Sequence, residues 1–223
     1  MAKFTRIEVC LIANKTGLVP LYFNTDAGTV KNVVKACYEG GARIFEFTNR
    51  GDFAHEVFNE LSKYVVNELP EMILGAGSVE DAATTALYIQ LGANFIVSPI
   101  LNSEMARVCN RKKIAWVPGC GTLTEIAYAE ELGAELVKIF PAMQVGGPDF
   151  IKSIKGPRPW TNIMPTGGVM PTEENLNDWF QAGAYCVGMG SKLITREIIE
   201  TSDWAALTSN VNDAIKIIKS IRG

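Results

Sequence analysis

Short apolar runs alternate with amphipathic segments along the whole chain, and this alternation limits the fold more than any other feature. Eight runs predict strands, at residues 18–23, 43–48, 72–76, 95–98, 114–117, 136–140, 163–165 and 185–187. Helical spacing of apolar residues fills the segments between them and residues 4–15, and a last helix carries an apolar stripe from Trp204 to Ile221. Because strands and helices alternate, we expect an α/β fold, a single (β/α)8 TIM barrel with an extra N-terminal helix.

An open doubly wound sheet is the competing architecture. The Gly-x-Gly-x-x-Gly turn that follows the first strand of a dinucleotide-binding sheet is absent. Connections between the predicted elements are short and no Ser/Pro-rich linker interrupts them, which predicts one domain over residues 1–223. The closed barrel is therefore the preferred fold, although the chain is below the ~250 residues typical of it.

Charge and cysteine content exclude several kinds of partner. Lys and Arg number 21 and Asp and Glu 24, so the net charge of −3 provides no basic field for nucleic acid or an anionic membrane. The five cysteines are scattered and form no Cys-x-x-Cys pair, which indicates a reducing compartment. No apolar run approaches the ~18 residues of a membrane span, and the N-terminus lacks the pattern of a secretory leader. We therefore expect a cytoplasmic protein.

The predicted strand at residues 136–140 carries a lysine, Lys138, among apolar neighbours, and Pro141 ends it. An ammonium group is strongly hydrated, so this position is unfavourable unless something is gained. The side chain either reaches solvent at the strand end or serves as a nucleophile. Its alternation with Val137 and Ile139 directs it into the barrel.

The second predicted strand contains a carboxylate in a similar setting. Phe45 and Phe47 share the face that suits the helix layer, so Glu46 points inward together with Thr48. A Glu and a Lys in one barrel interior have two interpretations, which these residues alone leave open. They form a structural ion pair, or they are a Schiff-base lysine and the carboxylic acid that moves its protons.

Residues just after the strands are candidate ligands, because a TIM barrel holds its chemistry at the carboxyl ends of its strands. Arg50 follows the second strand and either binds a carboxylate in bidentate fashion or forms a surface ion pair. Ser78 follows the third strand, where it is an N-cap, a ligand contact or both. Thr122 begins Thr122-Leu-Thr-Glu125, which is a capping-box pattern.

The last two predicted strands end in glycine-rich turns, Pro165-Thr-Gly-Gly168 and Gly188-Met-Gly-Ser191. Loops at these positions of a barrel commonly bind phosphate through backbone amides, so the pair predicts a small phosphorylated ligand. The single histidine, His55, falls on the polar side of its helix, and no residue cluster has metal-ligand spacing. We therefore expect neither a histidine-based triad nor a metal-dependent mechanism.

Together these motifs resemble a known family, the 2-keto-3-deoxy-6-phosphogluconate (KDPG) and 4-hydroxy-2-oxoglutarate aldolases. The resemblance runs through nearly the whole chain, in Glu46-Phe-Thr-Asn-Arg50, Gly75-Ala-Gly-Ser78, Ser98-Pro99, Pro118-Gly119, Val137-Lys-Ile-Phe-Pro141, Pro165-Thr-Gly-Gly168 and Gly190-Ser191. It implies a (β/α)8 barrel that assembles as a homotrimer, and a class I pyruvate aldolase without metal or cofactor. The implied reactions are cleavage of KDPG to pyruvate and glyceraldehyde 3-phosphate, and of 4-hydroxy-2-oxoglutarate to pyruvate and glyoxylate.

The resemblance also implies a role for each motif. Lys138 would form the Schiff base with the substrate, and Glu46 would be the general acid and base. Arg50 and Ser78 would bind the substrate carboxylate, and Pro99 would line the same pocket. The substrate hydroxyl and phosphate groups would contact Thr166, Gly167, Gly168, Gly190 and Ser191.

Some positions of this chain depart from the pattern of the gluconate enzymes. Met143 stands where Glu is common, and Asn49 and Gly51 stand where Leu and Thr are common. Ser78 replaces the usual Thr, and Cys120-Gly121 replaces the usual Ile-Ser. Lys138-Ile-Phe-Pro141, Pro118-Gly-Cys120 and Gly147–Lys152 look like the galactonate branch, which acts on the C4 epimer, whereas the Glu46 to Arg50 motif and Thr166 match the gluconate branch. The gluconate substrate is our first expectation. The galactonate epimer and a non-catalytic phosphosugar-binding barrel are the alternatives.

Overall fold

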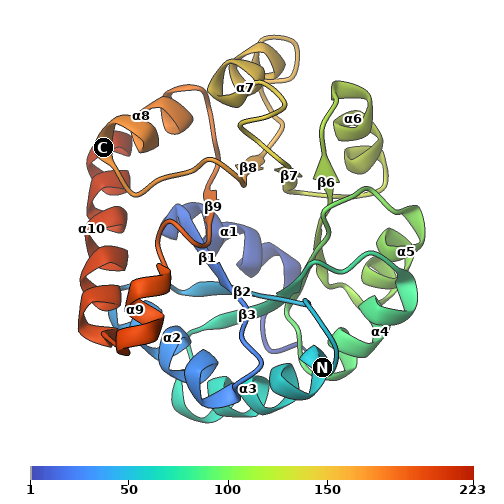
Figure 1. Cartoon of the computed structure of the whole chain (residues 1–223). Coiled ribbons are helices and arrows are strands. Elements are labelled where there is room, and N and C mark those ends of the chain that lie inside the picture. Colours follow the sequence, from blue (N-terminus) through green and yellow to red (C-terminus); the bar gives the residue numbers. More distant parts are fainter. Residues whose placement is uncertain (1) are drawn as a thin grey trace.

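The computed structural model describes residues 2–223, with parallel strands at the centre and helices around them (Figure 1). The helices are α1 (Arg6–Thr16), α2 (Ala27–Glu39), α3 (Ala54–Glu68), α4 (Ala82–Gln90), α5 (Ser103–Lys112), α6 (Leu123–Glu131), α7 (Gly147–Lys155), α8 (Glu173–Gln181), α9 (Arg196–Thr201) and α10 (Trp204–Arg222). The strands are β1 (Leu18–Tyr22), β2 (Ile44–Thr48), β3 (Ile73–Gly77), β4 (Phe95–Val97), β5 (Ala115–Val117), β6 (Gly119–Cys120), β7 (Val137–Ile139), β8 (Ile163–Pro165) and β9 (Val187–Met189). No helix among these residues is both long and apolar enough to cross a membrane.

The strands form two parallel sheets rather than the one eight-stranded ladder that we expected. A curled six-stranded sheet has the order β5-β4-β3-β2-β1-β9, and a second sheet has the order β6-β7-β8. Only Pro118 separates β5 from β6, and the chain changes its partner strand there, from β4 to β7. The Pro118 carbonyl accepts a hydrogen bond from the amide of Lys138 on β7. At the other junction an isolated bridge joins Thr166 to Gly188. The predicted α/β class and parallel sheet are confirmed.

The buried apolar side chains form two clusters, one on each side of the strands. The larger cluster lies between strands and helices and contains Phe45, Phe47, Val137 and Ile139. The smaller cluster fills the interior and contains Ile44, together with residues of α1, which packs against β1, β2 and β5. Strand alternation therefore directs Glu46 and Lys138 to the interior, as predicted. All five cysteines are free and buried.

The structure moves one predicted helix start near the site and keeps another. An N-cap at Ser78 would start the next helix at residue 79, but α4 begins at Ala82, because Asp81 is its N-cap and accepts a hydrogen bond from the amide of Thr84. Ser78 is therefore not a cap, and its φ of 55° places it in the left-handed region. Thr122 does cap α6, because its hydroxyl accepts from the amide of Glu125. The Glu125 carboxylate accepts from the amide of Gly121 and the hydroxyl of Thr122 instead of the Thr122 amide, so only this half of the predicted capping box forms.

Candidate active site

Glu46 on β2 and Lys138 on β7 meet in the interior, and we call them the interior pair. Nζ of Lys138 lies 3.7 Å from Oε1 of Glu46, and the exposed fractions of the two side chains are 7% and 0%. Both carboxylate oxygens of Glu46 are buried and accept no hydrogen bond from any of residues 2–223. Buried polar atoms in proteins are almost always paired, so an unpaired carboxylate requires an explanation other than stability.

The neighbouring strand makes room for this carboxylate. Residues 44–48 of β2 pair with residues 73–77 of β3, which places Gly77 opposite Thr48 and near the side chain of Glu46. A Cβ atom on Gly77 would lie 1.8 Å from Oε1 of Glu46, far inside van der Waals contact. Glycine at position 77 is therefore a condition for the position of Glu46. In the sequence this glycine is visible only as part of the motif Gly75-Ala-Gly-Ser78.

The surroundings of Lys138 include one aromatic ring and one tightly packed turn. Its Nζ lies 5.1 Å from the centroid of the Phe140 ring. Gly119, paired with Lys138 in the sheet, packs so closely on Pro99 that a Cβ there would lie 2.2 Å from the Pro99 carbonyl oxygen. The structure thus brings Pro99 to the Lys138 side of the fold. Burial raises the pKa of nearby Cys120 to about 12, so its thiol stays protonated near neutral pH.

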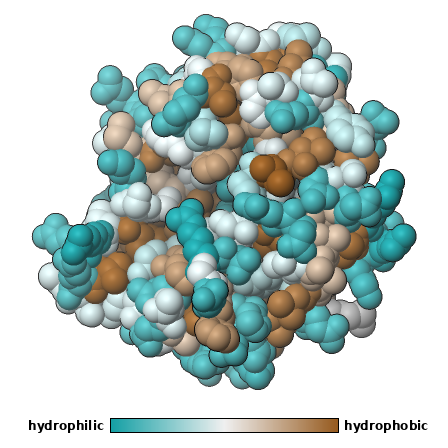
Figure 2. Space-filling model, turned by 45° about the vertical axis from the view of Figure 1, so that its right-hand side comes forward, coloured by the Kyte–Doolittle hydropathy of each residue, from teal (hydrophilic) through white to brown (hydrophobic). Residues whose placement is uncertain are grey.

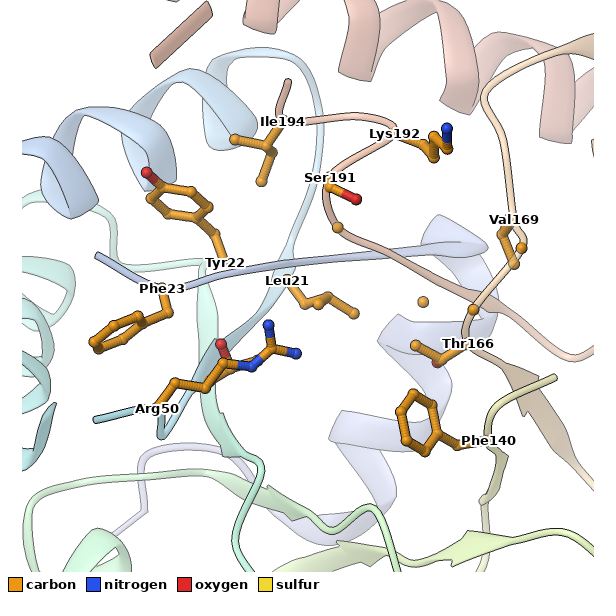
Figure 3. Close-up of a pocket in the computed structure, with 15 residues that line it drawn as sticks. Leu21, Tyr22, Phe23, Arg50, Phe140, Thr166, Val169, Ser191, Lys192 and Ile194 are labelled. Carbon is orange, nitrogen blue, oxygen red and sulfur yellow. The ribbon is translucent and has the colours of Figure 1, made fainter. Parts of the chain in front are cut away.

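A cavity of about 360 Å³ opens at the carboxyl ends of the strands, and we call it the mouth cavity (Figure 3). Six of the residues that the sequence singled out line it: Arg50, Thr166, Gly167, Gly168, Gly190 and Ser191. The other four, Lys138, Glu46, Ser78 and Pro99, are not among its lining residues. Phe140 lines the cavity and its ring lies beside Nζ of Lys138, so the lysine end of the interior pair is next to the cavity wall.

The mouth cavity offers unused hydrogen-bond donors. The backbone N–H groups of Gly167, Gly168, Gly190 and Ser191 donate to no backbone acceptor among residues 2–223. The hydroxyl of Thr166 is buried and likewise has no partner in this part of the chain. In Figure 3, Ser191 and Thr166 lie on two sides of the same space. Free amides of glycine-rich turns are a common phosphate-binding arrangement, so these two turns can hold an anion.

The charges around the mouth cavity are all positive. Its lining residues include Arg50 and Lys192 and no Asp or Glu. Arg50 is exposed and forms no hydrogen bond or ion pair with the described residues, so the surface ion pair considered for it does not occur among them. Sequence reasoning missed Lys192, because an exposed lysine after Gly-Ser has no pattern to distinguish it from a solvated surface. It also missed Phe140 as a lining residue, although Phe140 belongs to the predicted strand at residues 136–140.

Comparisons with known proteins identify the family of the chain. A family model described as KDPG and KHG aldolase matches residues 9–210. The fold is therefore that of an aldolase, an enzyme that makes or breaks a carbon–carbon bond. The chain belongs to the KDPG and KHG aldolase family.

Individual relatives cover nearly the full length of the chain. It is 33% identical over 216 residues to the 2-dehydro-3-deoxy-phosphogluconate aldolase of Pseudoalteromonas atlantica, covering 96% of this chain and 97% of that protein. The KDPG aldolase structure from Zymomonas mobilis ZM4 with 3-phosphoglycerate has 26% identity and a TM-score of 0.80, covering 93% and 94%. A structure described as native KDPGal has 25% identity and a TM-score of 0.81, covering 92% and 95%.

Proposed function

We propose that this chain is a class I pyruvate aldolase that reversibly cleaves KDPG to pyruvate and glyceraldehyde 3-phosphate. The observation that carries the proposal is the interior pair, a fully buried carboxylate with no hydrogen-bond donor and an amine 3.7 Å away. A structural ion pair is useful only when its geometry is good and its other lone pairs are satisfied, and Glu46 meets neither condition. Proton transfer to and from a substrate explains oxygens that are kept free.

In the first half of the reaction, Nζ of Lys138 adds to the C2 ketone of the substrate as a neutral amine. Glu46 supplies the proton with which the carbinolamine loses water, which leaves a protonated imine. Now a carboxylate, Glu46 takes the proton of the C4 hydroxyl, directly or through water. The C3–C4 bond breaks, its electron pair moves into the imine to form an enamine, and C4 leaves as an aldehyde.

In the second half, Glu46 returns the proton to C3 of the enamine, which restores a protonated imine. Water then hydrolyses this imine, releases pyruvate and frees Lys138. Protons and electrons balance over the cycle, so the mechanism requires no external oxidant, metal or cofactor. We accordingly expect activity to survive treatment with EDTA.

The groups at the mouth would supply orientation. Arg50 and Ser78 would bind the substrate carboxylate, and Pro99 would line that side. Thr166 would contact a substrate hydroxyl, and the amides of Gly167, Gly168, Gly190 and Ser191 would hold the phosphate. Binding energy gained away from the reacting bond fixes the substrate in a reactive geometry.

Borohydride trapping tests this proposal. The intact protein is incubated with pyruvate and sodium borohydride, and the modified residue is located by mass spectrometry. We expect a covalent adduct on Lys138. Absence of an adduct would reject the enzyme and favour a barrel that binds a phosphosugar without catalysis.

The galactonate epimer is the second candidate substrate, because Pro118-Gly-Cys120, Gly147–Lys152 and the residues around Lys138 resemble that branch. Cleavage rates on KDPG and on its C4 epimer, measured on one preparation, decide between them. A faster rate on the epimer would replace KDPG as the substrate. Cleavage of 4-hydroxy-2-oxoglutarate to pyruvate and glyoxylate belongs in the same assay, because the family includes both activities.

We also propose that the two sheets form one closed (β/α)8 barrel over residues 1–223, that the chain is a single domain, and that it acts as a cytoplasmic homotrimer. The Thr166–Gly188 bridge and the continuous chain through Pro118 support the barrel. Five free cysteines support a reducing compartment, and a net charge of −3 supports a small-molecule substrate over nucleic acid or a membrane.

The face in Figure 2 carries apolar patches between hydrophilic ones, and such patches could form contacts between subunits. Light scattering of the purified protein tests the trimer.

A further inference from the structure

A hydrogen bond outside the mouth cavity joins the two turns that carry the proposed carboxylate ligands to a helix behind them. The Tyr88 hydroxyl on α4 donates to Oδ1 of Asn49 over 2.8 Å. The backbone amide of Asn49 donates in turn to the Gly77 carbonyl over 2.7 Å. Asn49 directly precedes Arg50, and Gly77 directly precedes Ser78. One asparagine thus connects both turns, and one tyrosine anchors it.

The turn that carries Arg50 has little else to fix it. Two of the next four residues have positive φ, 82° at Gly51 and 59° at Phe53, so the backbone there follows no regular element. The Arg50 side chain contacts no hydrogen-bond or ion-pair partner among residues 2–223. The direction of its guanidinium therefore depends on where the backbone at Asn49 is held.

The tyrosine is a rigid anchor. Tyr88 is fully buried, and its ring packs edge-on against Phe58 with centroids 4.9 Å apart. Phe58 packs on Phe47 of β2, and Phe47 on Phe23, which lines the mouth cavity. Burial raises the pKa of Tyr88 to about 12, so its hydroxyl remains a hydrogen-bond donor throughout the neutral range.

We propose that Tyr88 and Asn49 are positioning residues, which hold Arg50 and Ser78 in place for the carboxylate of the keto-acid substrate. This inference rests on the proposed function. Asn49 is also a departure from the family pattern, where leucine is common and cannot accept a hydrogen bond. In this chain the residue beside the arginine offers an acceptor, and a buried tyrosine donates to it.

The test compares Tyr88→Phe, Asn49→Leu and the double variant in the condensation direction, with pyruvate and glyceraldehyde 3-phosphate varied separately. We expect each single variant to raise KM for pyruvate about five- to tenfold, since a buried polar partner is lost. The value of kcat and KM for glyceraldehyde 3-phosphate should stay within about twofold, because the phosphate turns are not involved. The double variant should resemble the single ones, because both remove the same bond.

Tyr185→Phe is the matched control. Its hydroxyl donates to the Cys10 carbonyl over 3.1 Å, beside α1 and away from the mouth cavity. This variant should lower the melting temperature without changing either KM. The inference is wrong if Tyr88→Phe behaves like Tyr185→Phe, or if the two single effects on KM multiply in the double variant. Should Tyr88→Phe fail to fold, Asn49→Leu decides alone, because it deletes the acceptor instead.

Borohydride trapping of the wild-type protein separates the two hypotheses. If pyruvate is trapped and the variants keep the wild-type KM, only the positioning role fails. If pyruvate is not trapped, the proposed function itself fails.

Discussion

The interior pair and the mouth cavity are built by different means. The interior pair consists of two side chains on regular strands, fully packed, with their separation fixed by sheet register and by the missing side chain of Gly77. The mouth cavity is an open space whose anion-binding groups are backbone amides and two exposed cations on loops. Under the proposed function, reaction chemistry would depend on the sheet and substrate recognition on the turns, so substitutions in the two regions should have different kinetic signatures.

Removing the Lys138 amine is the most severe test of the interior pair. We expect Lys138→Met to lower turnover by about 10⁴-fold or more, because the covalent route is lost. Borohydride should then trap no pyruvate, and circular dichroism should show a folded protein. Wholesale unfolding would instead identify the interior pair as a structural ion pair.

Filling the space beside the carboxylate comes next. We expect Gly77→Ala to lower kcat by about 10²-fold or more, because the new methyl group forces Glu46 out of place. Glu46→Gln should lower kcat by about 10²- to 10⁴-fold, because the amide cannot carry the proton. Steady-state kinetics measure both. Gly121→Ala is the control, because its Cβ would find no atom nearer than 3.6 Å. Full activity in Gly77→Ala would contradict the role assigned to this glycine.

At the mouth, the largest expected effect is on the carboxylate end of the substrate. Arg50→Ala should raise KM for pyruvate about 10- to 100-fold and change kcat much less, because a charged hydrogen-bond donor is lost. Arg50→Lys should recover part of the loss, since an ammonium keeps the charge without the bidentate fork. If Arg50→Ala lowered kcat as strongly as it raised KM, and raised KM for both substrates alike, Arg50 would not be specific to binding of the carboxylate.

The smallest effect is predicted for the cation that the sequence did not reveal. Lys192→Ala should raise KM for glyceraldehyde 3-phosphate about two- to fivefold, as expected for an exposed charge. The difference should shrink as salt is added, because exposed charges are screened. Lys152→Ala is the control, since Lys152 is an exposed lysine on α7 that does not line the mouth cavity. Equal effects from both variants would assign no role to Lys192.

The sequence predicted those parts of the site that follow a periodic rule. Alternation along two strands was enough to direct Glu46 and Lys138 inward, and the structure brings their charged groups within 3.7 Å. Glycine-rich turns after the last two strands were enough to predict the amide-lined part of the mouth cavity. Element types were likewise predictable, because apolar periodicity differs between strands and helices.

Features that depend on long-range packing were not predictable. The space left by Gly77 depends on a side chain 31 positions earlier, as 77 − 46 = 31, and only the strand register brings the two together. The left-handed backbone of Ser78 moved the start of α4 to Ala82, although Ser78 itself is a reasonable N-cap type. The division into two sheets falls at Pro118, where the chain changes its partner strand from β4 to β7, and the short strand β6 beyond it was not predicted because the apolar run ends at Val117.

The tight fit at Gly77 also bears on how this scaffold can be changed. Exposed turn positions of the mouth cavity, such as Ser191 and Lys192, can exchange side chains without entering packed volume, so their substitution is the route to a different acceptor aldehyde under the proposed function. Position 77 admits no such freedom while Glu46 is present, because any larger residue occupies the volume of the carboxylate. A descendant with a side chain at this position would be one that has given up the carboxylate, and with it the reaction.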